Sequence, residues 1–448
     1  MLLLPFRATL KLVDKTELAE RTDLDGPSIY YGVNPEGLPE DTLALGCVTS
    51  TMEYFDRSAP HPTVSRYVKV QDHRIPVLFE GSGGLSLDPV ASVLYFLSAW
   101  QEIHSVSTDE HGRFPYEQSI QHSLGNADEP WVEWYRHIFA DALRKKGATL
   151  ESKEWAGKDW AFCPTHDIDY DRKWRPGIYK RELLDRVVLN KDREDPTPRL
   201  SRVTDVFQSF LNREDPFQTA FSRMQDEVKS RGGRATYFMK SGGKGRRDVP
   251  YSLTSPFIYS QLVQLRANGF EIGHHPSYHA FLHPERLIRE KEKLETVCGF
   301  KILAHRAHYL RVSMPQSAHH VAESGFKVDS SLGFATQGGF RHATCLPFPL
   351  YDPVRQVELD VWEMPLTVME SSLFNRMNLT SAQASSYTDA LMATVARFGG
   401  VFVGLWHNTL WDERDYPGWG KHFIDTIDAA KDGGATMDTL SKTLESWK

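Results

Sequence analysis

The pattern of apolar and polar positions changes near residue 150. Before that point, short apolar runs at 44–50 and 75–79 are separated by turns rich in Gly, Pro and Asp, a pattern typical of short strands. Two longer apolar stretches, 88–104 and 129–147, each carry a proline in the first turn, which predicts that each begins a helix. We therefore predict a separate α+β N-terminal domain at 1–155, with a polar linker at its end.

From residue 156 to 448, short apolar runs alternate with helical stretches. Helices are predicted at 217–233, where apolar residues recur at helical spacing, and at 284–299, between Pro284 and Gly299. The strand-like runs are 159–165, 234–240, 269–275, 301–307, 325–331, 361–369 and 399–407. Alternating strands and helices predict an α/β fold of parallel β/α units, in which chemistry gathers at the carboxyl ends of the strands. The charged, proline-dotted stretch 171–215 is predicted to be a helical insertion over one rim.

Composition narrows the possible partners and metal ligands. The chain has 52 Lys and Arg against 59 Asp and Glu, a formal charge of -7, which disfavours nucleic acid. It has 18 His and 4 Cys, and the cysteines lack zinc-finger spacing, so a metal site would use imidazole and carboxylate. No signal peptide and no apolar run of about 18–20 residues is apparent, so we expect a cytoplasmic protein without a membrane span.

Two carboxylates follow the first strand of the second block. Asp167 and Asp169 stand two positions apart, and on an extended segment such residues face the same side, roughly 6.6–6.8 Å apart. A cation held by one carboxylate would let the other stay close as a base. The same pair could instead be solvated acids in a turn.

Two histidines at ligand spacing follow another strand. Pro276 favours an extended conformation at His275 and fits the first position of a helix, so that His279 would fall in its first turn. Imidazoles four residues apart there could converge on one ion. A single histidine is more often structural, so the metal prediction depends on this pair together with Asp-x-Asp.

An arginine and a further histidine end two other strands. Arg306 could orient a carboxylate by two hydrogen bonds and lower its pKa. His407 could protonate a leaving group. Each of them alone could equally belong to a rim salt bridge or a polar turn.

Together these motifs resemble the polysaccharide deacetylase superfamily (carbohydrate esterase family four) over about 160–410, in the expected order. The resemblance implies a distorted (β/α) barrel with one divalent ion. It implies three metal ligands, which are Asp169, His275 and His279. It implies Asp167 as general base, braced by Arg306, and His407 as general acid. The Asp-x-Asp pair and the stretch 336–353 resemble a bacterial subgroup with an extra N-terminal domain.

Further residues are expected around this site. The resemblance implies that Asp329 contacts the metal ligands but not the metal itself. Three residues are expected to contact a carbohydrate substrate: His308, Tyr309 and Trp406. Zinc is the expected metal, while Co²⁺, Ni²⁺ or Mn²⁺ suit the same ligands.

The sequence also departs from the family pattern. Ile168 separates the two acids, Pro276 stands where Ser or Thr is usual, and Ala-His-Tyr follows the arginine in place of Pro-Tyr. We predict a metal-dependent hydrolase that removes an N-acetyl or other N-acyl group from a sugar. Two alternatives stay open on the same scaffold. They are a non-catalytic carbohydrate-binding protein and a deformylase or cyclic amidase.

Overall fold

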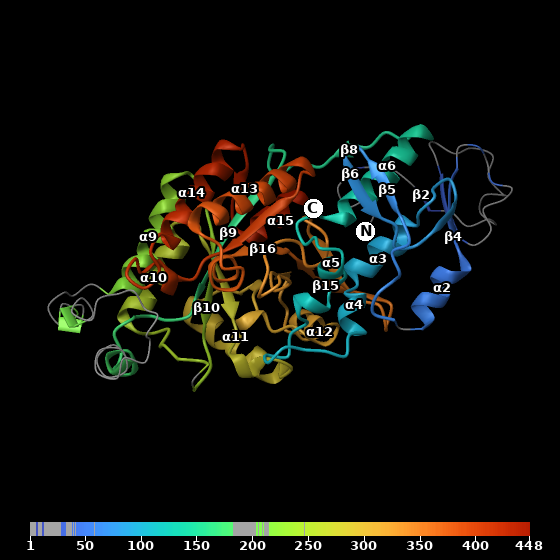
Figure 1. The fold of residues 1–448 in the computed structure, drawn as a ribbon. Helices are drawn as coiled ribbons and strands as arrows, with labels where there is room; N and C mark the ends of the chain where they lie inside the picture. The colour runs from blue at the N-terminus through green and yellow to red at the C-terminus, as the bar shows by residue number, and fades with distance from the viewer. Residues whose placement is uncertain are drawn as a thin grey trace.

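The computed structural model describes residues 6–7, 11–12, 28–32, 38, 40, 42–57, 59–181, 203–204, 206–207, 209, 215–245 and 247–448. The N-terminal elements pack on one end of a larger C-terminal part (Figure 1). Of the insertion predicted at 171–215, α7 (Pro176–Lys180) is a described helix, and most of the remainder lies outside the described residues. Within the described part of the chain, none of the helices combines the length and hydropathy that crossing a bilayer requires.

A ten-stranded, mostly parallel sheet forms the centre of the C-terminal part (Figure 1). Its order is β14, β15, β13, β12, β11, β10, β9, β17 and β16, with β18 beside β9. In chain order these strands are β9 (Ala161–Ile168), β10 (Thr236–Lys240), β11 (Glu271–His275), β12 (Ala304–His305), β13 (Val328–Asp329), β14 (Phe348–Asp352), β15 (Val357–Glu363), β16 (Leu366–Met369), β17 (Val401–Leu405) and β18 (Thr436–Met437). Every pairing is parallel except that of β14 with β15. Among the described strands, β14 and β16 end this order without pairing with each other. The sheet is therefore an open, distorted barrel, and the predicted α/β fold class is confirmed.

Helices connect these strands, and local sequence signals set their ends. The Asp215 carboxylate accepts a hydrogen bond from the backbone N–H of Phe217 at 2.9 Å, and Pro216 occupies the first turn of α9. Gly299 follows α11 with φ of 75°, a conformation that suits glycine at a helix end. The helices are α9 (Pro216–Ser230), α10 (Pro256–Ala267), α11 (Pro284–Cys298), α12 (Gln316–Glu323), α13 (Ser381–Arg397), α14 (Trp419–Asp432) and α15 (Leu440–Trp447). Short helical turns also follow four strands: η3 (Tyr278–Ala280), η4 (His308–Leu310), η5 (Ser372–Arg376) and η6 (Asn408–Trp411).

The N-terminal part has the α+β content that its sequence predicts. Its strands are β1 (Phe6–Arg7), β2 (Lys11–Leu12), β3 (Ser28–Gly32), β4 (Leu43–Cys47), β5 (Tyr67–Val70), β6 (His73–Pro76), β7 (Gly81–Gly83) and β8 (Glu151–Ser152). Its helices are α2 (Thr49–Asp56), α3 (Pro89–Leu97), α4 (Trp100–Ile103), η1 (Tyr116–Gln118), α5 (Ile120–Ser123) and α6 (Trp131–Lys145). The single helix predicted at 88–104 is two helices, because the backbone at Ala99 turns left-handed with φ of 57°. The domain boundary at 155 stays a prediction.

A buried ion pair joins the two parts of the molecule. Glu102 of α4 accepts hydrogen bonds from the Arg341 guanidinium at 2.8 and 2.6 Å, and His342 lies 3.3 Å from the same carboxylate. The side chains of Glu102 and Arg341 are 3% and 1% exposed. Because two charges so far from solvent depend on each other, the pair ties α4 to the loop before β14.

Replacing Glu102 with Gln is expected to lower the free energy of unfolding by about 3–5 kcal/mol, because Arg341 would stay buried without its counter-charge. Denaturant unfolding monitored by circular dichroism measures this change. As a control, Glu53→Gln breaks the exposed Arg57–Glu53 pair and should change stability by less than about 1 kcal/mol. Equal effects of the two substitutions would contradict a buried junction.

The same pair predicts acid sensitivity. Burial alone would raise the pKa of Glu102, but Arg341 and His342 outweigh it and lower the pKa to about 2. Since the pKa in the unfolded chain is about 4.3, the contribution of Glu102 to stability is present above that pH and is lost as the pH falls toward 2.

Candidate metal centre

Three parallel strands bring the predicted site residues together. Asp167 is the last but one residue of β9, and Asp169 directly follows the strand. His275 is the last residue of β11, which is separated from β9 by β10 alone. The neighbouring strand β12 leads into η4, which begins at His308. Because parallel strands end at the same edge of the sheet, all four side chains reach one place.

Asp169, His275 and His308 form the group that could hold a metal ion. Their ligand atoms lie within 4.8 Å of one another. His275 Nε2 is 3.6 Å and His308 Nε2 is 3.4 Å from Asp169 Oδ1. Two imidazoles and one carboxylate suit Zn²⁺ and similar divalent ions, and three protein ligands leave coordination positions open.

The surroundings of these ligands support the assignment. His275 Nδ1 lies 2.8 Å from the Arg306 carbonyl oxygen and His308 Nδ1 lies 3.0 Å from Asp248 Oδ1. Each Nδ1–H is thereby donated, so that each Nε2 would turn its lone pair toward a bound ion. Among the described residues, His275 Nε2 and Asp169 Oδ1 are buried atoms without a hydrogen-bond partner. A cation at this position would satisfy both atoms.

Electrostatics at the group also favour a cation. Burial alone would raise the pKa of Asp169, but the positive charges of His308 and Lys240 hold it well below its ordinary value. Burial alone would lower the pKa of His308, yet the Asp169 carboxylate raises it. Asp169 thus draws positive charge to this position, and a divalent ion would compete there with the proton on His308.

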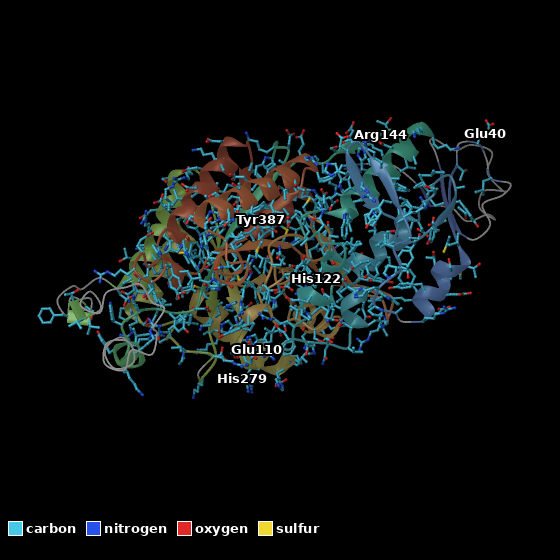
Figure 2. All side chains as sticks on the ribbon, viewed as in Figure 1. Glu40, Glu110, His122, Arg144, His279 and Tyr387 are labelled. Carbon is cyan, nitrogen blue, oxygen red and sulfur yellow. The ribbon has the colours of Figure 1, made fainter. Side chains whose placement is uncertain are left out.

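The structure places His279 away from this group, which corrects the predicted third ligand. The prediction required a helix that starts at Pro276, but Ser277 is still extended, with φ of -65° and ψ of 154°. Only the three-residue turn η3 follows, so the spacing of four residues does not put His275 and His279 on one face. His279 is exposed at the surface (Figure 2). His308, predicted only to contact substrate, takes its place.

Asp167 lies beside the metal group and is held by Arg306. Asp167 Oδ2 is 3.6 Å from His275 Nε2 and Oδ1 is 3.5 Å from Arg306 Nη1. Arg306 is fully buried and also donates to Thr165 Oγ1 at 2.6 Å and to the Ser330 backbone and hydroxyl oxygens at 2.8 Å. Burial raises the pKa of Asp167 to about 6, against the lowering effect of Arg306 and His407.

His407 faces the two aspartates from the end of β17, the strand next to β9. Its Nε2 is 4.0 Å from Asp167 Oδ2 and 4.0 Å from Asp169 Oδ2. Its Nδ1 lies 2.8 Å from Glu370 Oε1, which also accepts the His407 backbone N–H at 2.6 Å. Burial alone would lower the pKa of His407, but Glu370 and the two aspartates raise it to about 10. Nε2 therefore carries a proton that points into the site.

Glu370 and Asp248 are site residues that the sequence analysis missed. Glu370 directly follows the predicted strand run 361–369, so a carboxylate at a strand end was an available signal. Asp248 lies in the loop between β10 and α10, where no local pattern marks it. Asp248 belongs to the site only because the folded loop brings its carboxylate to His308.

Trp406 does not reach the site. It continues the alternation of β17, so Leu405 and His407 line the site cavity while Trp406 points to the opposite face. Its side chain is fully buried and packs on Phe423 of α14, with ring centroids 5.1 Å apart. This corrects its predicted contact with substrate.

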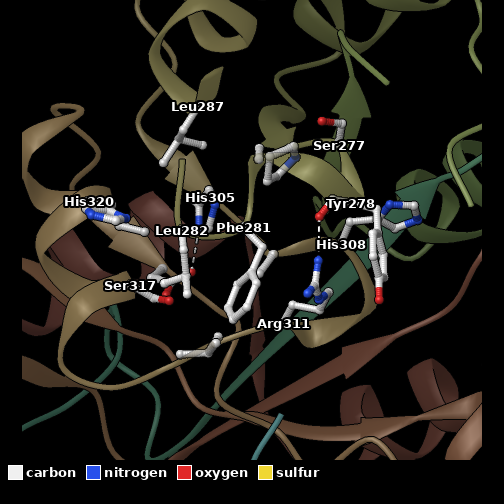
Figure 3. Close-up of a pocket in the computed structure, with 16 residues that line it drawn as sticks. Ser277, Tyr278, Phe281, Leu282, Leu287, His305, His308, Arg311, Ser317 and His320 are labelled. Atoms are coloured by element: carbon white, nitrogen blue, oxygen red, sulfur yellow. Dashed lines mark hydrogen bonds and ion pairs between the residues drawn. The ribbon is translucent and has the colours of Figure 1, made fainter. Parts of the chain in front are cut away.

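Asp329 supports the site through hydrogen bonds and is not one of the possible metal ligands. It accepts hydrogen bonds from His305 Nδ1 at 2.9 Å (Figure 3) and from Ser331 Oγ at 2.5 Å. Ser331 Oγ in turn accepts the backbone N–H of Ala307 at 2.9 Å. Asp329 thus supports the backbone between Arg306 and His308.

These side chains open into one cavity. Asp167, Asp169, His308, Tyr309 and His407 line it, together with residues of η5 and of the N-terminal part. The Tyr309 side chain is 39% exposed there. The arrangement provides a cation position, a carboxylate and a protonated imidazole within one accessible space.

Comparison with known proteins gives matches to both parts of the chain. A family of unknown function (DUF7033) matches residues 8–148. No curated protein matches the chain. Among solved structures, a putative polysaccharide deacetylase from Mycobacterium smegmatis is similar at 17% identity and a TM-score of 0.42, covering 64% of this chain and 90% of its own.

Two other solved structures are similar over the same share of the chain. An allantoinase aligns at 12% identity and a TM-score of 0.43, covering 65% of this chain and 92% of its own. A family 4 carbohydrate esterase from Streptomyces lividans, in complex with acetate, aligns at 12% identity and a TM-score of 0.32, covering 64% and 95%. The chain is thus similar to a putative polysaccharide deacetylase, an allantoinase and a family 4 carbohydrate esterase, at 12–17% sequence identity.

Proposed function

We propose that the protein is a metal-dependent hydrolase that removes an N-acyl group, such as acetyl, from a sugar. Asp169, His275 and His308 would hold the ion. When bound, a divalent ion at this position would acidify a water molecule and polarise the acyl oxygen. The observation that carries the proposal is that three possible metal ligands, two of whose facing atoms lack a hydrogen-bond partner, converge on one cavity with a carboxylate and a protonated imidazole.

Two side chains would move the protons. Asp167 Oδ2 would accept a proton from the attacking water, and Arg306 keeps this carboxylate ionised and oriented. His407 Nε2 would donate a proton to the departing amine nitrogen, and Glu370 holds the ring through Nδ1 so that Nε2 faces the cavity. The bond that breaks is the amide C–N bond, and the products are a free amine and a carboxylate.

The presence of both proton carriers argues for catalysis. A protein that only binds carbohydrate needs neither a base at Asp167 nor an acid at His407. Their distance of 4.0 Å and their common exposure to the cavity fit a pair that acts on one substrate bond. An assay must determine which acyl group the protein removes.

Release of acetate from an N-acetylated oligosaccharide tests the proposal. Zn²⁺- or Co²⁺-loaded protein is expected to release acetate from tetra-N-acetylchitotetraose, measured by an enzyme-coupled acetate assay, and to lose this activity in a chelator. Parallel reactions with N-formyl glucosamine and allantoin test other amides. If the metal-loaded protein hydrolysed allantoin and no N-acyl sugar, the substrate class would be wrong; if it hydrolysed none, the catalytic assignment would fail.

A further inference from the structure

The N-terminal part contributes two side chains to the wall of the candidate active site. The cavity lined by Asp167, His308 and His407 is also lined by His111 and Arg113. Both lie in the loop between α4 and η1, within the segment that matches a family of unknown function. The barrel therefore does not enclose this cavity by itself.

The loop 109–113 has a fixed conformation. Asp109 Oδ1 accepts the backbone N–H groups of His111 at 2.8 Å and of Arg113 at 3.0 Å, and Asp109 Oδ2 accepts Arg113 Nε at 2.6 Å. Gly112 has φ of 74°, which lets the backbone turn between the two cavity residues. The side chains of His111 and Arg113 are buried apart from their cavity faces.

Residues of the barrel clamp this loop in place. Arg311 donates from Nε to the His111 carbonyl oxygen at 2.6 Å. It also donates from Nη1 to the Tyr278 carbonyl oxygen at 2.6 Å (Figure 3). His111 Nδ1 is 3.2 Å from the Tyr278 hydroxyl. Because Arg247 donates to that same hydroxyl oxygen, the hydroxyl proton is free to bond His111 Nδ1. His111 Nε2–H is then the remaining donor of the ring, and the Glu110 carboxylate lies 3.6 Å from it, beyond hydrogen-bond distance.

Arg113 holds the backbone of Tyr309, whose ring lines the cavity. Its Nη1 donates to the Tyr309 carbonyl oxygen at 2.8 Å. Tyr309 has φ of 60°, a left-handed conformation that costs energy for a residue with a side chain. The rings of His111 and Tyr309 lie 4.9 Å apart. The N-terminal loop thus places the His111 imidazole beside the Tyr309 ring of the barrel.

We propose that the loop 109–113 is a subsite that binds the sugar units next to the N-acyl sugar. This inference rests on the proposed function. Sugars offer an apolar C–H face and hydroxyl groups at its edge, which match an aromatic ring beside a hydrogen-bond donor. His111 contacts a sugar hydroxyl, and Arg113 is a positioning residue that acts through Tyr309. The N-terminal part therefore sets the preference for chains over single sugars.

The test compares a chain with a single sugar as substrate. In wild-type protein, kcat/KM for acetate release is expected to be higher for tetra-N-acetylchitotetraose than for N-acetylglucosamine. His111→Ala is expected to lower the ratio of the two values about tenfold, mainly by raising KM for the tetramer, since one hydrogen bond is worth about that factor. Arg113→Met should lower the same ratio, and Arg113→Lys, which keeps the charge and one donor, should restore part of it.

Controls separate this role from a structural one. Glu117→Gln alters an exposed side chain of the same N-terminal segment and should leave the ratio at the wild-type value. Metal content should match wild type in all four variants. A wild-type ratio in both His111→Ala and Arg113→Met would overturn the subsite while leaving the proposed function intact. If wild-type protein hydrolysed no N-acyl sugar, the proposed function would fail and this inference with it.

Discussion

Replacing Asp167 with Asn is expected to reduce kcat about 10²–10⁴-fold, the range typical of a lost general base. Asparagine keeps the size of the side chain but cannot accept the proton of the attacking water. Asp167 is not one of the three ligands, so the metal should stay bound. Acetate release and elemental analysis on the same preparation measure both quantities.

A neighbouring aspartate provides the matched control. Asp171 lies two residues beyond Asp169 but does not line the cavity. Asp171→Asn should therefore have nearly wild-type kcat. If Asp167→Asn kept wild-type turnover, the base would be misassigned; if it lost the metal as well, Asp167 would be a ligand instead.

Replacing His308 with Ala is expected to remove the bound metal. The substitution takes away one of three ligands, so the affinity should fall by more than the 10–100-fold that is typical when only the partner of a ligand is lost. Asp248→Asn removes the negative charge of the group that pairs with His308 Nδ1, and its loss of affinity should fall within about that range. Titration with Zn²⁺ in the presence of a competing chelator measures these affinities.

His279→Ala is the matched control for the ligand set. His279 is exposed and outside the group of Asp169, His275 and His308. We expect the variant to bind metal as tightly as wild type. Normal binding by His308→Ala together with loss of binding by His279→Ala would restore the ligand set that the sequence predicts and refute the one that the structure supports.

The sequence predicts those parts of the site that depend on strands. Asp167, Asp169, His275, Arg306 and His407 all stand at or just after a short apolar run. Parallel strands end at the same edge of a sheet, so identifying the runs was enough to expect these residues in one place. Their chemical roles stay predictions until the variants are measured.

Local sequence patterns do not predict the conformation of the turns that follow the strands. The prediction that His279 is a ligand requires a helix after Pro276, whereas the chain forms only η3. His308 begins η4, which contains the left-handed Tyr309, and the Tyr309 carbonyl oxygen accepts a hydrogen bond from Arg113 of the N-terminal part. Such conformations depend on tertiary contacts that no local sequence window contains.

The N-terminal part shows the same limit. Apolar runs and proline positions predicted β4, part of β6 and the helices α3 and α6, apart from the break at Ala99. They predicted neither α2 nor the other strands. The contribution of His111 and Arg113 to the cavity could not be predicted either, because both residues lie in a polar loop far from the barrel motifs in sequence. Only the folded chain brings them beside Tyr309.

The location of the ion is the central claim, and anomalous diffraction from crystals of Zn²⁺-loaded protein measures it directly. We predict one strong peak at the zinc edge, about 2.0–2.2 Å from Asp169 Oδ, His275 Nε2 and His308 Nε2, with Asp167 and His407 beside it and His279 at the surface. A zinc ion bound by His275 and His279 without His308, or no peak at this edge of the sheet, would contradict the account.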